Sequence, residues 1–192
     1  AILGLGILVS EADNILETIL PVNDYWLEFF NAMSGQGFAT WREILASVVT
    51  APIVEETIFR GMLLNGFLKH YSIKKSILLS ALLFGIIHLN PWQFVTAFSV
   101  GIMLGWWYTK TGSVIPTIFG HALFNGMSFI MDAFGLSITG YNSASSIGWR
   151  QPVWFDLLGI ILLSCGLICL TRQFDKRFDT ERTVKIADQS NS

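Results

Sequence analysis

A series of long, mainly apolar runs follows one another along the chain, and each run predicts a helix. The runs cover residues 41–68, 76–89, 92–109, 113–134 and 153–170. They are longer than an ordinary strand, and short polar or glycine-rich turns separate them. Because a helix needs about 20 mainly apolar residues to cross a bilayer, the pattern predicts an all-α fold, a polytopic transmembrane helix bundle.

The beginning of the chain departs from this pattern. Residues 1–9 are apolar but too few to cross a membrane alone. Residues 10–40 carry five acidic residues and no lysine or arginine. We therefore expect residues 1–40 to hold a partial transmembrane segment and an acidic extramembrane region, and the natural chain to begin before Ala1.

The composition agrees with a single membrane domain. Of the 192 residues, 52% are hydrophobic and 14% are charged, and the mean hydropathy is +0.54; soluble domains contain about 25% charged residues. A net charge of -2 does not favour a nucleic-acid partner, so the expected partner is the lipid bilayer. We expect a functional core in residues 41–134, a loop and the last transmembrane helix in residues 135–172, and a polar cytoplasmic tail in residues 173–192.

Cationic residues predict the orientation of the bundle. If successive helices alternate in direction, nine lysines and arginines lie at one set of helix ends, and Arg42 and Arg150 lie at the other. Cytoplasmic loops carry the excess of positive charge, so the larger set and the C-terminal tail are expected in the cytoplasm. The larger set comprises Lys69, Lys74, Lys75, Lys110, Arg172, Lys176, Arg177, Arg182 and Lys185.

Charge inside an apolar run is the most informative feature of the chain. Glu55, Glu56 and Arg60 lie within six positions of one another, and ionisable residues at bilayer depth are rare and mark functional sites. The i, i+4 spacing of Glu56 and Arg60 predicts an intrahelical ion pair. Glu55 points about 100° away from Glu56 on a helix, so we expect it to be free for chemistry.

Three further residues predict local backbone geometry. Pro52 lies one turn before the carboxylates, where it should kink the helix and free a backbone carbonyl close to the site. Gly101 and Gly105 lie one turn apart on the run over residues 92–109. Such a pair of small residues predicts close packing against a neighbouring helix.

Two of the three histidines fall inside apolar runs. His88 follows Phe84 by four residues and His121 precedes Asn125 by four, which places each pair on one helix face. At about 1.5 Å per residue, Glu55, His88 and His121 lie roughly 12 to 21 Å from the expected cytoplasmic helix ends. We therefore expect these three side chains to share one intramembrane cavity.

This set of side chains suits hydrolysis of an amide bond in a peptide or protein near the membrane. Glu55 with His88 can hold and deprotonate a water molecule. His121 and Asn125 can polarise a carbonyl and stabilise a tetrahedral oxyanion, which is worth about 3 kcal/mol per donor in known hydrolases. The serine-hydrolase and zincin patterns do not apply, because the sequence has neither a nucleophile elbow nor HExxH.

The same residues resemble the signatures of a known family, the CAAX prenyl protease and bacteriocin-processing family (CPBP or Abi). Its members are intramembrane glutamate proteases that include the type II CAAX endopeptidases. The likeness covers residues 41–134, about half of the chain. The matching segments are Glu55-Glu56-Thr57-Ile58-Phe59-Arg60 for EExxxR, Phe84-Gly85-Ile86-Ile87-His88 for FxxxH, and His121-Ala122-Leu123-Phe124-Asn125 for HxxxN.

The resemblance implies an integral membrane endopeptidase of all-helical fold, located in a bacterial cell membrane and independent of metal cofactors. Residues 41–134 would then form the catalytic core. The roles that it implies are water activation by Glu55 and His88, an oxyanion hole of His121 and Asn125, and support of the site by Glu56 and Arg60.

Two alternatives stay open beside a metal-independent protease. Glu55, His88 and His121 could instead hold a divalent metal such as zinc, as three ligands with an open position. The protein could also be a non-catalytic bacteriocin self-immunity or peptide-binding membrane protein, whose function would survive Glu55→Gln. A transporter is a weaker interpretation, because no inverted repeat is visible.

Overall fold

The computed structural model describes residues 1–22, 24, 26, 28, 41–143 and 150–190, with side chains up to residue 176 in the last helix. The named elements in these residues are all helices, so the all-α prediction is confirmed. They are α1 (Ile2–Ile19), α3 (Trp41–Ile44), η1 (Leu45–Thr50), α4 (Ala51–Glu56), η2 (Thr57–Leu64), α5 (Asn65–Phe67), α6 (Ile73–Ile87), α7 (Pro91–Thr111), α8 (Ile115–Ala133) and α9 (Val153–Ser190).

The predicted helix over residues 41–68 is present as the consecutive segments α3 to α5. The residues at the joins keep right-handed helical φ and ψ angles, so these segments form one continuous helix. Two of them, η1 and η2, are π-helical and flank α4, which carries both carboxylates. Short π-helical segments are rare and often occur at functional sites. Pro52 is the second residue of α4, which follows η1 directly.

The turn between α6 and α7 has residues that suit its geometry. Leu89 adopts a positive φ of 50° immediately after His88, and this conformation ends α6. Asn90 caps the next helix, because its side-chain oxygen accepts hydrogen bonds from the backbone N–H groups of Trp92 at 3.0 Å and Gln93 at 3.3 Å. The turn therefore fixes His88 at the very end of α6.

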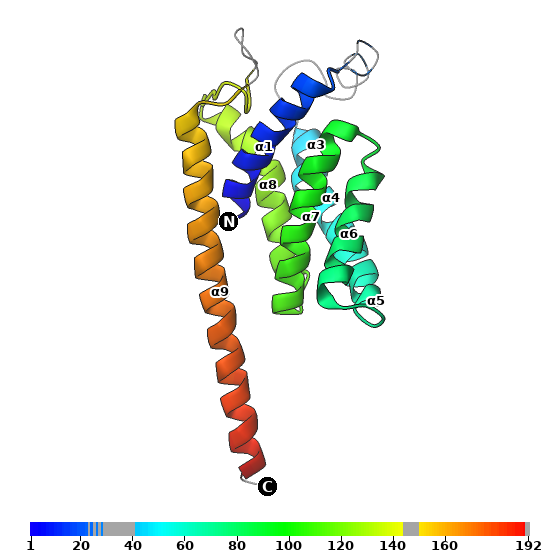
Figure 1. Ribbon diagram of the computed structural model, residues 1–192, viewed down its shortest axis with the longest axis vertical. Coiled ribbons are helices and arrows are strands. Elements are labelled where there is room, and N and C mark those ends of the chain that lie inside the picture. Colours follow the sequence, from blue (N-terminus) through cyan, green and yellow to red (C-terminus); the bar gives the residue numbers. More distant parts are fainter. Residues whose placement is uncertain (23, 25, 27, 29–40, 144–149, 191–192) are drawn as a thin grey trace.

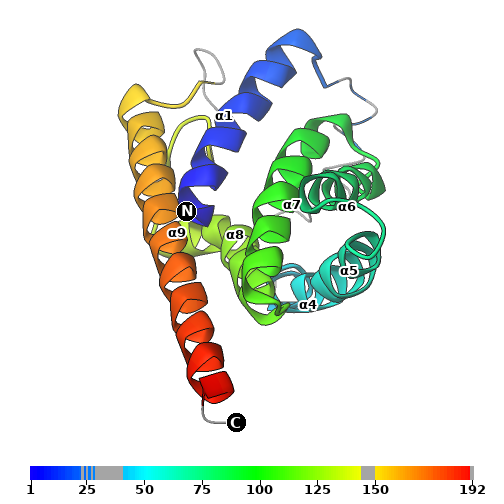
Figure 2. The same cartoon turned by 60° about the horizontal axis from the view of Figure 1, so that its bottom comes forward.

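Helix α7 lies at the centre of the bundle (Figure 1), where it contacts α1, α6, α8 and η2. Helix α9 packs against α1 on one side of the molecule, and α4 and η1 pack against α8 on the other (Figure 2). The segment with the paired carboxylates therefore packs against α8, which lies far from it in the sequence.

Gly101 and Gly105 allow α7 to approach α6 closely. A Cβ atom added at Gly101 would lie 3.0 Å from the Ala81 Cα, and one added at Gly105 would lie 3.2 Å from the Ile77 Cγ2. Both glycines thus face α6, and the close packing predicted from their spacing is confirmed.

Gly101→Val is expected to destabilise the protein by about 1 to 3 kcal/mol, because the new side chain overpacks the contact with the Ala81 backbone. Gly66→Ala is the matched control, since an added Cβ there meets nothing within 4 Å and alanine favours helix. Thermal unfolding in detergent measures both effects. Equal unfolding temperatures for the two variants would contradict the close helix contact.

Helix α1 continues without interruption past residue 10, where the expected acidic region begins. Its polar side chains find partners far away in the sequence. Asn14 donates a hydrogen bond to the Gly140 carbonyl at 2.8 Å, and the Glu11 carboxylate accepts one from the Gln151 backbone at 2.9 Å. Such bonds compensate the burial of polar groups. The later part of the expected acidic region lies outside the described residues.

Helix α9 is longer than predicted. Its segment Val153–Lys176 is, among the described residues, the one helix long and apolar enough to cross a membrane by length and composition. The polar tail expected over residues 173–192 is helical as far as Ser190. Lysine, arginine, glutamate and glutamine are good helix formers, so the polarity of this segment does not end the helix.

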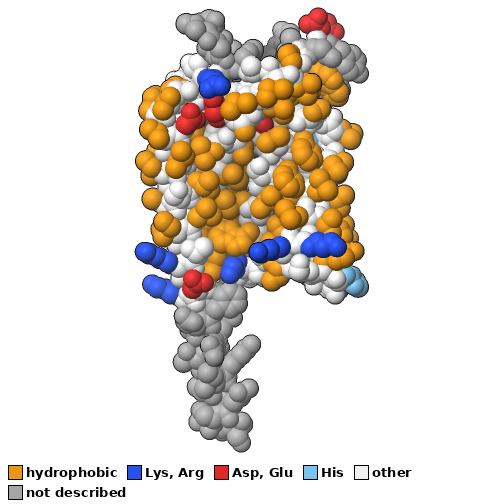
Figure 3. All heavy atoms as spheres, viewed as in Figure 1, with side chains coloured by type: hydrophobic (Ala, Val, Ile, Leu, Met, Phe, Trp, Pro, Cys, Tyr) orange, Lys and Arg blue, Asp and Glu red, His pale blue; other side chains and the backbone are white. Residues whose placement is uncertain are grey.

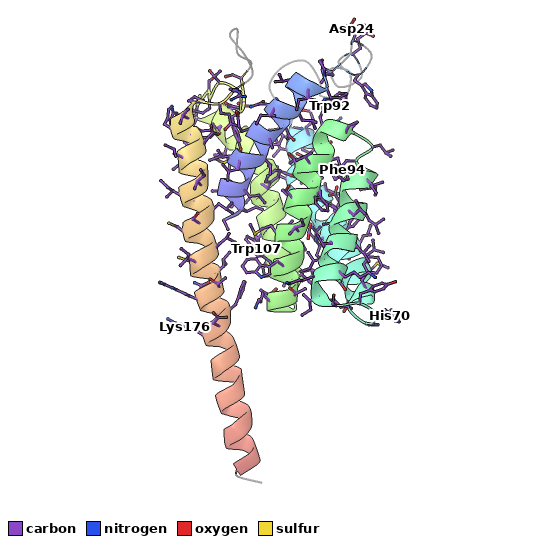
Figure 4. All side chains as sticks on the ribbon, viewed as in Figure 1. Asp24, His70, Trp92, Phe94, Trp107 and Lys176 are labelled. Carbon is purple, nitrogen blue, oxygen red and sulfur yellow. The ribbon has the colours of Figure 1, made fainter. Side chains whose placement is uncertain are left out.

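The outer surface has an apolar middle and two polar ends. Figure 3 shows hydrophobic side chains covering the middle of the visible face, with basic side chains gathered toward its lower end. His70 and Lys176 lie at this lower end, whereas Asp24 and Trp92 lie at the opposite end (Figure 4). Large exposed apolar surfaces mark contact with a membrane or a partner.

Candidate active site

Glu56 and Arg60 form the expected ion pair inside the bundle. The Arg60 Nη1 donates to the Glu56 Oε1 at 2.7 Å, and both residues are 0% exposed. Their i, i+4 spacing places them on one helix face across the join between α4 and η2. Since an unpaired buried charge is costly, this contact allows both ionised groups to stay in the interior.

Arg60 has two further partners that hold its guanidinium in place. Its Nη2 donates to the Gly101 carbonyl of α7 at 3.1 Å. The guanidinium carbon also lies 4.7 Å from the centre of the Phe84 ring, a distance at which the ring attracts a cation. Arg60 therefore connects the carboxylate helix to both α6 and α7.

His121 of α8 contacts the same Glu56 carboxylate. Its Nδ1 lies 2.9 Å from the Glu56 Oε1, the oxygen that also accepts from Arg60, and its Nε2 lies 3.8 Å from the Glu55 Oε2. With Glu56 ionised, the Nδ1–H donates to it, and this hydrogen bond fixes the orientation of the ring. The imidazole thus lies between the two adjacent glutamates, with its second nitrogen directed toward Glu55.

Glu55 differs from Glu56 in exposure. Its side chain is 32% exposed, compared with 0% for the Glu56 side chain. The 3.8 Å separation from the His121 nitrogen is too long for a direct hydrogen bond and leaves this carboxylate accessible. The structure therefore separates an accessible glutamate from a buried one, as the helix geometry predicts.

His88 lies at the end of α6, where it is half-buried. Its Nδ1 lies 2.7 Å from the Phe84 carbonyl, and donation of the Nδ1–H to this oxygen leaves the Nε2 as an acceptor. The Phe84 ring contacts the rings of both histidines, with centres 5.1 Å from His88 and 5.7 Å from His121. Within the described part of the chain, no hydrogen bond or ion pair joins His88 to Glu55.

Asn125 lies one turn after His121 on α8 and reaches back to η1. Its Nδ2 donates to the Ser47 carbonyl at 2.8 Å. The Asn125 side chain is thereby held against the carboxylate helix, and one amide hydrogen and the amide oxygen are left for other partners. The Asn125 side chain of α8 therefore contacts the continuous helix that also carries Glu55 and Glu56.

An apolar groove of about 460 Å³ runs beside the site between η1 and α8. Its walls include Val48 and Gly126, which are the sequence neighbours of Ser47 and Asn125. The groove therefore provides an apolar surface next to the contact that holds Asn125.

Glu55, His88 and His121 do not form a three-ligand metal site. Among the residues that the structure describes, no group of three or more histidine, cysteine, aspartate or glutamate side chains is placed to hold a metal ion. His88 is joined to Phe84 and not to the two other members of the set. The arrangement does not fit a catalytic zinc site, and we derive no chemical step through a metal.

Comparison with known proteins shows what the segment that carries this site is similar to. Residues 37–127 match the family model described as type II CAAX prenyl endopeptidase Rce1-like. This matched segment is similar to an Rce1-like domain. The matched segment contains all seven fixed residues of the three motifs, and the resemblance predicted from those motifs is confirmed.

One curated protein of similar sequence is "Putative membrane peptidase YdiL" of Bacillus subtilis (strain 168). It is 27% identical over 88 residues, which are 46% of this chain and 36% of that protein. The chain thus spans little more than a third of the length of this relative. No solved structure matches the chain.

Two backbone carbonyls of the matched segment, those of Ser47 and Gly101, contact site residues but were not predicted as parts of the site. Pro52 is the sequence signal for the first, because a proline inside a helix frees a carbonyl of the preceding turn. For the second, the small-residue pattern predicts that α7 lies close to a neighbour but does not predict that Arg60 reaches its backbone.

Proposed function

We propose that the protein is an integral membrane endopeptidase that hydrolyses a peptide bond with a water molecule activated by glutamate and histidine. The observation that carries the proposal is the placement of His121 between Glu55 and Glu56, with the charge of Glu56 balanced by Arg60. This placement combines an accessible carboxylate with an imidazole that a buried carboxylate orients. Together they provide a base and a polar group for a substrate carbonyl.

In this proposal, Glu55 is the general base. It takes a proton from the water as the water oxygen bonds to the peptide carbonyl carbon, and it returns the proton to the leaving amine nitrogen when the C–N bond breaks. The free Nε2 of His88 accepts a hydrogen bond from the same water. Glu55 is suited to this task because its side chain is partly exposed and lies 3.8 Å from the His121 Nε2, too far for a direct hydrogen bond.

His121 and Asn125 stabilise the tetrahedral intermediate in the same proposal. When its Nε2 carries a proton, His121 donates to the carbonyl oxygen, and the second amide hydrogen of Asn125 donates beside it. Glu56 and Arg60 act through His121, because Glu56 fixes its ring and Arg60 holds Glu56. Hydrogen-bond donors fixed before the reaction cost little reorganisation when charge develops on the oxygen.

We further propose a multi-pass location in a bacterial cell membrane with the C-terminus in the cytoplasm. Support comes from the apolar middle of the surface (Figure 3), the candidate span Val153–Lys176 and the excess of lysine and arginine at one end. The substrate class is a peptide or protein segment close to the bilayer. The related protein that is named a membrane peptidase agrees with this class.

Proteolysis of a peptide library by the protein in detergent tests the proposed function. We expect the wild type to cleave peptides and His88→Ala to lower kcat by about 10²-fold or more, since a residue that holds the attacking water is lost. His70→Ala is the matched control, because His70 is exposed, lies at the lower end of the molecule (Figure 4) and is not one of the predicted site residues. Equal cleavage by both variants would contradict the role of His88.

The same assay decides between the metal-independent and metal-dependent forms of the reaction. We expect cleavage to continue in the presence of EDTA or 1,10-phenanthroline, because the site side chains do not form a three-ligand metal site. Loss of cleavage with chelator and its recovery with zinc would contradict the glutamate mechanism.

A further inference from the structure

The hydrogen-bond register of η1 leaves one carbonyl without its backbone donor. At the end of this π-helical segment the Ala51 N–H donates to the Ala46 carbonyl, five residues earlier. The next bond in this series would run from residue 52 to the Ser47 carbonyl. Residue 52 is a proline, which has no N–H group, so the backbone cannot supply that donor.

The missing donor is replaced by a side chain from a different helix. Asn125 of α8 donates its Nδ2–H to the Ser47 carbonyl at 2.8 Å, although the two residues are 78 positions apart in the sequence. Pro52 is buried and Ser47 and Asn125 are half-buried. In such surroundings a carbonyl without a donor is costly, and the gain from satisfying it orients the amide of Asn125.

We propose that Pro52 is a positioning residue for Asn125: by withholding a backbone N–H from the Ser47 carbonyl, it reserves that carbonyl for the Asn125 side chain. The inference rests on the proposed function for its effect on catalysis, because it is Asn125 that contacts the substrate oxygen. Pro52 itself contacts neither the substrate nor a reacting atom.

Two other prolines show that the position, and not proline as such, has this effect. Pro91 and Pro116 lie in the first turns of α7 and α8, where the N–H groups have no helical acceptor and a missing N–H frees no carbonyl. Pro52 also lies near the beginning of a named segment, α4, but η1 precedes it without a break in helical conformation. Its missing N–H therefore falls inside a continuous helix.

The test begins with Pro52→Ala and Pro52→Val, which both restore an N–H at this position, the second with little loss of volume. The new N–H competes for the Ser47 carbonyl and releases the Asn125 amide. We expect kcat for peptide cleavage to fall about 10-fold to 100-fold, with KM changed less than about two-fold. The unfolding temperature should not fall, because a helical hydrogen bond replaces the lost one. Pro116→Ala should retain wild-type kcat.

A double-substitution cycle separates positioning from general damage. In a protein that already carries Asn125→Ala, adding Pro52→Ala should lower kcat no further, since the side chain that Pro52 orients is gone. Independent, multiplicative losses from the two substitutions would overturn the inference, as would wild-type kcat in both Pro52 variants. Losses of kcat that follow a drop in unfolding temperature in both variants would overturn it as well.

A spectroscopic measurement tests the contact without any activity. In protein labelled with ¹⁵N-asparagine, the Asn125 side-chain amide is assigned by its absence in Asn125→Ala. One of its two protons should exchange slowly with solvent in the wild type, and this protection should fall at least 10-fold in Pro52→Ala but persist in Pro116→Ala. Unchanged protection in Pro52→Ala overturns the inference. A wild type that cleaves no peptide but shows the change in protection overturns only the proposed function.

Discussion

Glu55→Gln is expected to lower kcat for peptide cleavage by about 10³-fold or more while the protein stays folded. Glutamine keeps the shape of the side chain but cannot accept the proton of the attacking water, and loss of a general base typically costs 10² to 10⁴-fold. Because the Glu55 side chain is 32% exposed and its carboxylate lies 3.8 Å from the His121 Nε2, the free energy of unfolding of the protein should change by less than about 1 kcal/mol. Initial rates and thermal unfolding in detergent measure the two quantities.

Glu43→Gln is the matched control for this substitution, since Glu43 lies on α3 at the beginning of the same continuous helix and outside the predicted site. It should cleave at the wild-type rate. Cleavage by Glu55→Gln at that same rate would contradict the role of Glu55 as a base. A wild type that binds peptide without cleaving it, together with unchanged binding by Glu55→Gln, would favour the immunity or peptide-binding alternative.

Glu56→Leu is expected to lower the free energy of unfolding by about 3 to 5 kcal/mol. The substitution leaves Arg60 buried without its carboxylate, and one partner removed from a buried pair typically costs this much. The Gly101 carbonyl and the Phe84 ring still contact the guanidinium, but neither carries a compensating negative charge. The His121 Nδ1 also loses its acceptor. Thermal or denaturant unfolding in detergent measures the loss.

The double variant Glu56→Leu/Arg60→Leu distinguishes an unpaired charge from a disturbed core. Because both charges are gone, it should unfold at a higher temperature than Glu56→Leu alone. It should still be inactive, since His121 is no longer oriented. A double variant less stable than the single one would show that packing around Glu56, and not the charge of Arg60, dominates the effect.

Local patterns were sufficient for much of the fold. The continuous helix over residues 41–68 follows from its apolar run, and the contact of α7 with α6 follows from Gly101 and Gly105. The long-range partners of Glu11 and Asn14 on α1 could not be predicted in this way. Their partners, Gln151 and Gly140, lie more than 120 positions away, and no local pattern indicates a hydrogen bond between residues so far apart.

The sequence by itself determined the ion pair of Glu56 with Arg60 and the divergence of Glu55 from it. Each of these depends only on spacing along one helix, which has fixed geometry. The tertiary structure alone decided that His121 lies against both glutamates and that Asn125 takes the Ser47 carbonyl. These contacts depend on how α8 packs against α4 and η1. Packing is set by the shapes of all the helices together, so the spacing within one helix cannot predict it.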